Sequence, residues 1–385
     1  MNTFKETDQD ANFDILENFE RFHQKNEMFR RSQWDKRIRN EKTERFYTSH
    51  GSVNEWRKAD GFTQRDYALR NAAWHISDVF TDIHGDQGRR EGFTDIFTLN
   101  TEVAPEKADL GTDAQAAVEI KRVAKFFGAG DAGITAFDER WQYTERFSDI
   151  EGIEKPPEIT PEMGLLSVVV ITIPMDYGLV KTVPSALGSA ATGTGYSNDA
   201  RALIALTQFI RGLGYEAYGS LNDTAMSIPY AVKAGLGEFG RNGLLISKNH
   251  GPRVRIGKVY TNMPLAHDKP INFGVREFCE ICKRCAKTCP SKSIPMGEPS
   301  DKPLSISNLK GVRKWTVDVE SCFAFWETQN SDCAVCIRTC PYNKDYSHWW
   351  HRAALWLAGT PLRGLVHVMD EWLGYGKRLK PKAWW

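Results

Sequence analysis

Residues 279–290 read CEICKRCAKTCP. Their spacing, C-x2-C-x2-C-x3-C-P, is typical of cysteines that bind a bacterial [4Fe–4S] cluster. A second array, between Cys322 and Cys340, repeats this spacing with its first interval stretched to C-x10-C, and Pro341 follows it. Together the two arrays predict a ferredoxin-like segment with two [4Fe–4S] clusters.

In such arrays three cysteines surround one cluster, and the fourth turns away to the other cluster. We therefore expect one cluster to be bound by Cys279, Cys282, Cys285 and Cys340, and the other by Cys289, Cys322, Cys333 and Cys336. The alternative is a pair of structural zinc sites, which usually use two separated C-x2-C pairs. Neither array has that layout, so the spacing favours iron–sulfur clusters.

The composition is that of a globular protein of 385 residues, with 41% hydrophobic and 26% charged residues. All eight cysteines lie between Cys279 and Cys340, whereas a disulfide framework spreads its cysteines through a short secreted chain. The formal net charge is +1, which provides no overall electrostatic attraction for nucleic acid. We therefore expect no nucleic-acid partner.

The longest apolar run, residues 165–173, has the length of a buried strand and is far shorter than the roughly 20 residues of a membrane-spanning helix. Arg30 and Arg31 suggest a twin-arginine export signal, but polar residues follow where an apolar stretch is needed. As the sequence stands we expect a cytoplasmic protein. It would be exported or membrane-associated if such a signal has been removed.

Outside the cysteine arrays, helical and strand patterns alternate and predict an α/β layer. A helix is expected over 114–127 and is ended by Gly128. A glycine- and threonine-rich loop over 188–195 is expected to precede a helix that begins at Ser197–Asp199. Strands are expected over 166–173, 215–218 and 254–260.

The sequence divides into four regions. They are a helical or irregular N-terminal region (1–110), an α/β core (111–273) with an insertion at about 128–164, a two-cluster segment (274–345) and a tryptophan-rich C-terminal segment (346–385). We expect the tryptophans of the last segment to pack a terminal helix against the body of the protein. The alternative is a contact with a membrane surface, aided by Lys377, Arg378, Lys380 and Lys382.

Three motif matches are interpreted as coincidental. Residues 128–133 and 235–240 both fit G-x-G-x-x-G, but neither leaves a strand and opens a helix, as a dinucleotide-binding fingerprint must. Residues 82–88 come within one residue of D-x-H-x-x-G, by which some corrinoid enzymes bind cobalt through histidine, but Gln87 replaces the glycine. We therefore expect a helix end, a tight loop and a surface turn at these places.

A set of further residues carries a family resemblance over roughly 110–385. They are Thr192 and Tyr196 in a T-x3-Y pattern, Asn222, and the stretches 234–243, 251–255 and 263–265, together with both cysteine arrays. In these features the chain resembles the catalytic subunit of the corrinoid-dependent reductive dehalogenases. The resemblance implies a nitroreductase-like α/β (α+β) corrinoid-binding core with a ferredoxin-like module attached.

The resemblance also implies a cofactor and a reaction. Members of this family hold a base-off cobalamin or related cobamide without a protein ligand to the cobalt. They reduce a carbon–halogen bond of a small halogenated organic molecule, R–X + 2e⁻ + H⁺ → R–H + X⁻. An unidentified low-potential electron donor, a membrane-anchored partner and a homodimer are the expected associations.

The family's catalytic residues correspond to Tyr196, Arg255 and Asn222, and Thr192 and Trp326 correspond to its substrate pocket. Their chemistry suits the reaction. A neutral tyrosine, with an ordinary pKa of about 10, holds a proton at neutral pH. A permanently charged arginine stabilises the phenolate that donation leaves. The helix start expected directly after Tyr196 would favour the same anion through its dipole.

Two other functions are considered. An epoxyqueuosine reductase would use the same cofactors on a modified tRNA base. It is placed second because such an enzyme often carries a basic RNA-binding surface after its clusters, whereas the net charge of this chain is only +1. A ferredoxin-type electron carrier or a cobamide-processing protein would need no proton donor. The long sequence before Cys279 argues against a simple carrier.

Overall fold

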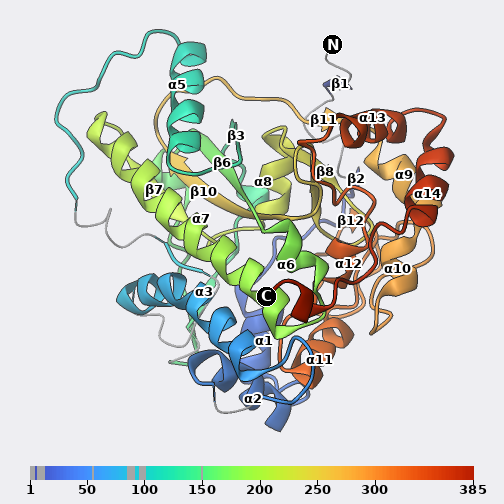
Figure 1. The fold of residues 1–385 in the computed structure, drawn as a ribbon. Coiled ribbons are helices and arrows are strands. Elements are labelled where there is room, and N and C mark those ends of the chain that lie inside the picture. The colour runs from blue at the N-terminus through green and yellow to red at the C-terminus, as the bar shows by residue number, and fades with distance from the viewer. Residues whose placement is uncertain (1–4, 7–13, 54–55, 85–91, 95–100, 149–150) are drawn as a thin grey trace.

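The structure is a computed structural model that describes residues 5–6, 14–53, 56–84, 92–94, 101–148 and 151–385 (Figure 1). Its centre is a four-stranded sheet in the order β3-β6-β10-β7, and all its pairings are antiparallel. The strands are β3 (Asp131–Ala136), β6 (Ser167–Pro174), β10 (Val254–Thr261) and β7 (Ala217–Ser220). The mixed fold class is confirmed in its α+β form.

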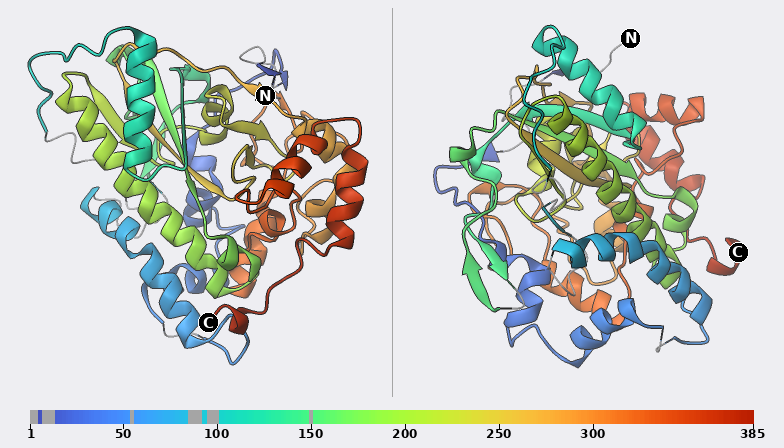
Figure 2. Two further views of the ribbon diagram at one scale, coloured as in Figure 1. Left: turned by 45° about the horizontal axis from the view of Figure 1, so that its top comes forward. Right: turned by 90° about the vertical axis from the view of Figure 1, so that its left-hand side faces the viewer.

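Side-chain alternation along β6 builds a core on each face of the sheet. Val169, Ile171 and Ile173 pack toward α5 (Asp113–Phe126) and α7 (Ala186–Gly212). Val168 and Val170 pack on the other face, toward α8 (Ser227–Lys233). The long helix α3 (Gln64–His84) packs along α7, so that α7 is enclosed between the sheet and the N-terminal region (Figures 1 and 2).

The prediction of a loop over 188–195 is wrong, because these residues lie in the first half of α7. The helix begins at Ala186, and the Ser185 hydroxyl caps it by accepting a hydrogen bond from the Gly188 N–H at 2.9 Å. Glycine lowers helix propensity, but a Cβ on Gly193 would lie 2.5 Å from the Trp74 ring. Close packing against α3 therefore requires glycine here and overrides the local preference.

The remaining elements frame the central layer. In the N-terminal half these are β1 (Lys5–Glu6), β2 (Asp14–Ile15), α1 (Met28–Trp34), α2 (Glu41–Gly51), β4 (Arg146–Ser148), β5 (Ile153–Lys155) and α6 (Tyr177–Lys181). In the C-terminal half they are β8 (Gly237–Phe239), β9 (Leu245–Ser247), β11 (Ile271–Asn272), α9 (Val275–Cys282), α10 (Arg284–Thr288), β12 (Val312–Arg313), α11 (Val319–Gln329), α12 (Val335–Arg338), α13 (Trp349–Ala358) and α14 (Arg363–Trp372).

Neither glycine motif opens a helix after a strand. Gly128 has a φ of 110° directly after α5, and residues 235–247 build the hairpin of β8 and β9. The segment expected as an insertion at about 128–164 contributes β3 to the central sheet and then forms the β4–β5 hairpin. The D-x-H-like stretch begins at the end of α3 and continues into 85–91, which lie outside the described residues.

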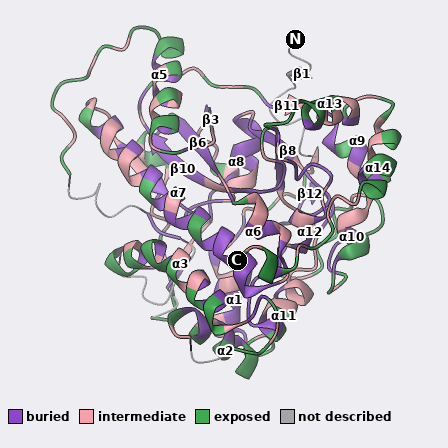
Figure 3. Ribbon diagram, in the orientation of Figure 1, coloured by how far each residue is buried: buried purple, intermediate pink, exposed green. Residues whose placement is uncertain are grey.

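The C-terminal tryptophans are mostly exposed, so the expected packing is wrong for this group. Trp349 on α13 and Trp372 on α14 are 75% and 82% exposed. Figure 3 shows that α13 and α14 both carry exposed stretches. The two helices bury their opposite sides, including Ala358 and Val366, against the α9 region. The last two tryptophans do contact the body of the protein: Trp384 packs beside Leu179 and Val180, and Trp385 Nε1 donates a hydrogen bond to Asp66 at 2.9 Å. No helix in the described part of the chain has the length and apolar character that crossing a bilayer requires.

Candidate active site

A cavity of about 900 Å³ lies where the N-terminal region, the central layer and the cysteine segment meet. Its walls include Phe46 of α2, Tyr196 of α7, Arg255 of β10 and Trp326 of α11. This volume is at the upper end of the range for ligand pockets, and most of its lining is apolar. The cavity is therefore large enough for a bulky cofactor together with a small substrate.

The structure brings the three expected catalytic residues together at this cavity. The Tyr196 hydroxyl accepts a hydrogen bond from the Asn222 amide Nδ2 at 3.0 Å, and Arg255 Nη1 lies 3.5 Å from the same oxygen. The Arg255 guanidinium also lies 5.2 Å from the centre of the Tyr196 ring. Two donors, one of them charged, thus face the oxygen that would carry a negative charge after proton donation.

The helix-dipole contribution expected for Tyr196 is wrong. Because α7 begins at Ala186, Tyr196 lies in the middle of this helix, where the N-terminal partial charge does not reach. Stabilisation of a phenolate at this site therefore rests on Arg255 and Asn222. Gly195 permits the close approach, because a Cβ there would lie 2.9 Å from the Arg255 Cγ.

Trp74 of α3 holds the Tyr196 ring in place, a role that the sequence interpretation missed. The two rings are stacked with centroids 5.1 Å apart and planes inclined by 24°. Both residues are buried, at 3% and 7% exposure. No pattern in the sequence pointed to Trp74, because only the packing of α3 on α7 brings this tryptophan from the N-terminal third of the chain to the Tyr196 ring.

The two expected pocket residues also line the cavity, on different walls. Thr192 lies one helical turn before Tyr196, and its hydroxyl donates a hydrogen bond to Asp332 Oδ2 at 2.8 Å. Trp326 packs against Phe29 of α1, with ring centroids 5.8 Å apart. Thr192 therefore joins the core to the cysteine segment, and Trp326 forms part of an aromatic wall.

One group of four cysteines borders the cavity. This near pocket consists of Cys289, Cys322, Cys333 and Cys336. Burial raises the pKa of Cys322 and of Cys333 to about 12, and neighbouring thiols of the group add to both shifts. At Cys289 hydrogen bonds, led by that from the Ser291 hydroxyl, outweigh burial and lower the pKa.

The other four cysteines line a separate small hollow of about 20 Å³, together with Arg241 and Phe278. This far pocket consists of Cys279, Cys282, Cys285 and Cys340. Burial raises the pKa of all four thiols, so thiolates here require a cation in their midst. Arg241 Nε donates a hydrogen bond to the Cys279 carbonyl at 3.0 Å and brings one fixed positive charge to the pocket.

The spacing of the sulfur atoms does not fit zinc. Four thiolates around one zinc ion at about 2.3 Å would lie about 3.8 Å from one another. Among the described residues, which include all eight cysteines, no three sulfur atoms lie within 4.8 Å of one another. The wider grouping fits ligands that surround a cluster of several iron atoms.

Two buried charged residues near Tyr196 were also missed. Asp199 of α7 and Lys258 of β10 are both fully buried. Burial raises the pKa of Asp199 to about 8, and burial lowers the pKa of Lys258 to about 7. Lys258 Nζ donates hydrogen bonds to the Leu221 carbonyl and, at 2.8 Å, to the Ser227 hydroxyl.

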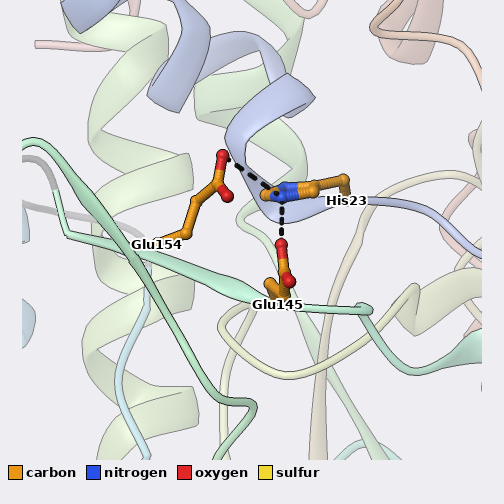
Figure 4. A group of neighbouring side chains, drawn as sticks. All are labelled: His23, Glu145 and Glu154. Carbon is orange, nitrogen blue, oxygen red and sulfur yellow. Dashed lines mark ion pairs between the residues drawn. The ribbon is translucent and has the colours of Figure 1, made fainter.

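A further cluster, His23 with Glu145 and Glu154, contains residue types that bind metal ions (Figure 4). The His23 nitrogen that faces the two carboxylates carries a proton, however, and so is not available as a metal ligand. His23 Nδ1 accepts a hydrogen bond from the Lys25 N–H, so the proton of the neutral ring lies on Nε2. Nε2 faces Glu145 at 2.6 Å, and the Lys25 ammonium lies 3.0 Å from Glu154. The cluster is an ion-pair group that ties the β4–β5 region to the N-terminal segment.

Two family patterns match the chain in sequence. The family described as "Reductive dehalogenase subunit" matches residues 154–265, and the family described as "4Fe-4S dicluster domain" matches residues 278–344. The first range contains Tyr196, Asn222 and Arg255, and the second contains all eight cysteines. With the two cysteine pockets, the second match identifies two [4Fe–4S] clusters as groups that the chain binds.

A tetrachloroethene reductive dehalogenase of Desulfitobacterium hafniense is 32% identical in an alignment that covers 87% of this chain and 73% of that protein. An epoxyqueuosine reductase of Lactococcus garvieae is also 32% identical, but the alignment covers only 34% of this chain and 38% of that protein. The similarity to the reductive dehalogenases is therefore much more extensive.

Among solved structures, a catabolic reductive dehalogenase matches all of this chain with a TM-score of 0.76 and 22% sequence identity. The chain spans about half the length of that protein. At this identity the match supports the fold, and it covers the N-terminal region as well as the core and the cysteine segment.

Proposed function

Because the chain belongs to the reductive dehalogenase family, we propose that it replaces one halogen atom of a small organic molecule with hydrogen, R–X + 2e⁻ + H⁺ → R–H + X⁻. The observation that carries this proposal is the Tyr196 hydroxyl, held by Asn222 and Arg255, at a cavity that the near pocket borders. Because the D. hafniense relative is a tetrachloroethene reductive dehalogenase, chlorinated ethenes are the first substrates to test.

The cavity fits a cobamide by its chemistry. Asn242 Nδ2 and Arg255 Nε line it as buried donors without a hydrogen-bond partner, which suits the amide-rich edge of a corrinoid. Lys314 also lines it, and burial lowers the pKa of this lysine to about 8, so an anion such as a phosphate would be a favourable neighbour. A bound cobamide would supply redox-active cobalt chemistry for breaking the carbon–halogen bond, with the two clusters as the source of electrons.

The residues of the chain supply the proton and control its surroundings. Tyr196 holds the proton on its hydroxyl oxygen and donates it to the carbon that loses the halogen. The negative charge left on that oxygen is stabilised by the Arg255 guanidinium and by the Asn222 amide. Trp74 keeps the ring in one orientation, so that the hydroxyl stays at the cavity.

The apolar walls strengthen these interactions. Phe29, Phe46 and Trp326 line the side formed by α1, α2 and α11. Such walls bind a halogenated hydrocarbon through apolar contact and reduce the amount of water near Tyr196. The attraction between Arg255 and a phenolate is stronger in this environment than in water.

The test begins with protein purified without oxygen and loaded with cobalamin. We expect about eight iron atoms and about one cobalt atom per chain, together with halide release from chlorinated ethenes. Tyr196→Phe is expected to keep both metals and to lose turnover by about 10²–10⁴-fold, since it removes the proton donor. Tyr218→Phe, on β7, is the matched control and is expected to keep turnover.

Two results would contradict the proposal. Near-normal turnover by Tyr196→Phe would remove the proton-donor role. Metal-loaded protein that reduces an epoxyqueuosine-containing tRNA, and not an organohalide, would assign the second function. The low-potential donor, the membrane-anchored partner, the homodimer and the cellular location stay predictions from the sequence.

A further inference from the structure

A line of hydrogen bonds reaches the Tyr196 hydroxyl from a buried lysine that no catalytic motif includes. Lys258 Nζ donates to Ser227 Oγ at 2.8 Å, Ser227 Oγ donates to Asn222 Oδ1 at 3.4 Å, and Asn222 Nδ2 donates to Tyr196 at 3.0 Å. Lys258 is fully buried, and Tyr196 is nearly so. We infer that Lys258 is a positioning residue that acts through Ser227 to turn the donor end of the Asn222 amide toward the Tyr196 oxygen.

The direction of each hydrogen bond follows from which atoms of each side chain can donate and which can accept. Lys258 Nζ donates to Ser227 Oγ, so this hydroxyl accepts from the lysine and has its own proton free for another acceptor. That acceptor is the Asn222 carbonyl oxygen. The amide then has only its NH₂ group left to present to Tyr196.

The orientation of the amide decides which form of Tyr196 is favoured. With its NH₂ group toward the tyrosine, Asn222 stabilises the phenolate and makes Tyr196 a stronger proton donor. With the amide reversed, its carbonyl would accept the tyrosine proton and stabilise the neutral phenol instead. Lys258 therefore affects the proton donation proposed above without touching the substrate, and the inference rests on that proposed function.

The sheet explains how a distant lysine reaches this site. Arg255 and Lys258 lie three residues apart on β10, and strand alternation places them on opposite faces. Arg255 approaches Tyr196 directly from the α7 face. Lys258 lies on the α8 face with Ser227, which is the first residue of α8.

In its ionised form Asp199 favours a charge on Lys258 in this buried position. It lies on α7 one turn after Tyr196, and its carboxylate packs against the backbone of Gly257, where a Cβ would clash with it. Neither of its oxygens has a hydrogen-bond partner. Its attraction raises the pKa of Lys258 and so opposes the larger effect of burial.

The experiment measures the ionisation of residue 196 directly. 3,5-Difluorotyrosine is incorporated at this position of the full chain with both clusters present and no substrate, and it is titrated by ¹⁹F NMR. Fluorination lowers the intrinsic pKa of the phenol and brings the titration toward neutral pH. The variants are Ser227→Ala and Lys258→Met.

Each variant is expected to raise the pKa of the fluorinated phenol by about one unit, which is a tenfold weaker acid. Lys233→Met is the matched control, because Lys233 is a buried lysine of α8 that pairs with Asp138 at 2.5 Å. It is expected to leave the titration unchanged. The pH dependence of halide release should shift in the same direction in the first two variants.

An unchanged titration in folded Ser227→Ala would overturn the inference, even if Lys258→Met did not fold. An equal shift in Lys233→Met would also overturn it, because the effect would then be a general consequence of removing a buried amine. The titration requires no dehalogenation. Failure of the wild-type protein to release halide would therefore count against the proposed function and not against this inference.

Discussion

The near and far cysteine pockets are built from almost the same spacing, yet they differ in the space that adjoins them and in the contacts that hold them. The near pocket opens onto the cavity of about 900 Å³ beside Tyr196 and Trp326. The far pocket is a hollow of about 20 Å³ between α9, the β8–β9 turn and residues 340–342. Local spacing thus determines that a cluster binds, and the neighbouring elements determine which cluster can serve the cavity.

The difference also concerns what holds each pocket together. The far pocket is secured by charges: Arg241 binds the carbonyls of Cys279, Pro295 and Gly297, and Asp370 of α14 pairs with Arg284 and Lys344. The near pocket is secured by α11 and by aromatic packing. We expect electrons to enter through the far pocket and leave through the near one.

Removal of one ligand from each pocket gives the largest expected effect. Cys333→Ala in the near pocket and Cys282→Ala in the far pocket should each lower the iron content from about eight to about four atoms per chain. Only the near-pocket variant should abolish halide release driven by a small reductant such as titanium(III) citrate, which can bypass the far cluster. Iron analysis and halide assays check both. Equal loss of halide release would remove the functional difference between the pockets.

Asp370→Asn is expected to destabilise the far pocket strongly. Asp370 is 4% exposed and is the shared partner of Arg284 and Lys344, so its loss leaves two buried cations without this counter-charge. Breaking such a buried pair costs about 3–5 kcal/mol. Thermal unfolding and retention of iron give the measurement. Glu371→Gln, the exposed neighbour, is the control, and an equal loss of stability there would disprove the role of the pair.

Glu238→Gln should change how stability depends on pH. Glu238 accepts hydrogen bonds from the Phe273 and Val275 N–H groups at 2.6 and 3.3 Å, and burial raises its pKa to about 7. The folded protein therefore keeps a proton that the unfolded chain releases above its ordinary pKa of 4.5, and stability falls as the pH rises toward 7.

The glutamine side chain keeps the acceptor and does not titrate. Between pH 5.5 and 7, Glu238→Gln should therefore gain about 2 kcal/mol relative to the wild type. Denaturant unfolding at several pH values measures the gain. A difference that stays constant with pH would show that Glu238 is ionised in the folded protein throughout this range.

Trp372→Ser should have the smallest effect. This tryptophan is 82% exposed on α14, beyond the buried side that packs toward the far pocket. Its loss should change the free energy of unfolding by less than about 0.5 kcal/mol and leave halide release unchanged. Unfolding curves and the halide assay test this together. A large loss of stability would mean that the α14 surface supports the far pocket more than its exposure indicates.

Much of the central layer was predicted from the sequence. The strand expected over 166–173 is β6, and the helix expected over 114–127 is α5. Both have a strong periodic pattern of apolar residues, which local physical chemistry translates directly into structure. The stretch 188–195 was predicted wrongly because its glycines have a tertiary purpose, the approach of Trp74 to α7, that no local pattern reveals.

The sequence by itself determined the cluster chemistry, because thiolate ligands and short fixed spacings are local properties of the chain. It also identified Tyr196, Asn222 and Arg255 through the family resemblance. Only the tertiary structure decided that Trp74, Ser227, Asp199 and Lys258 surround these residues. These neighbours come from three separate helices and a strand, and they meet because both faces of one buried sheet are covered.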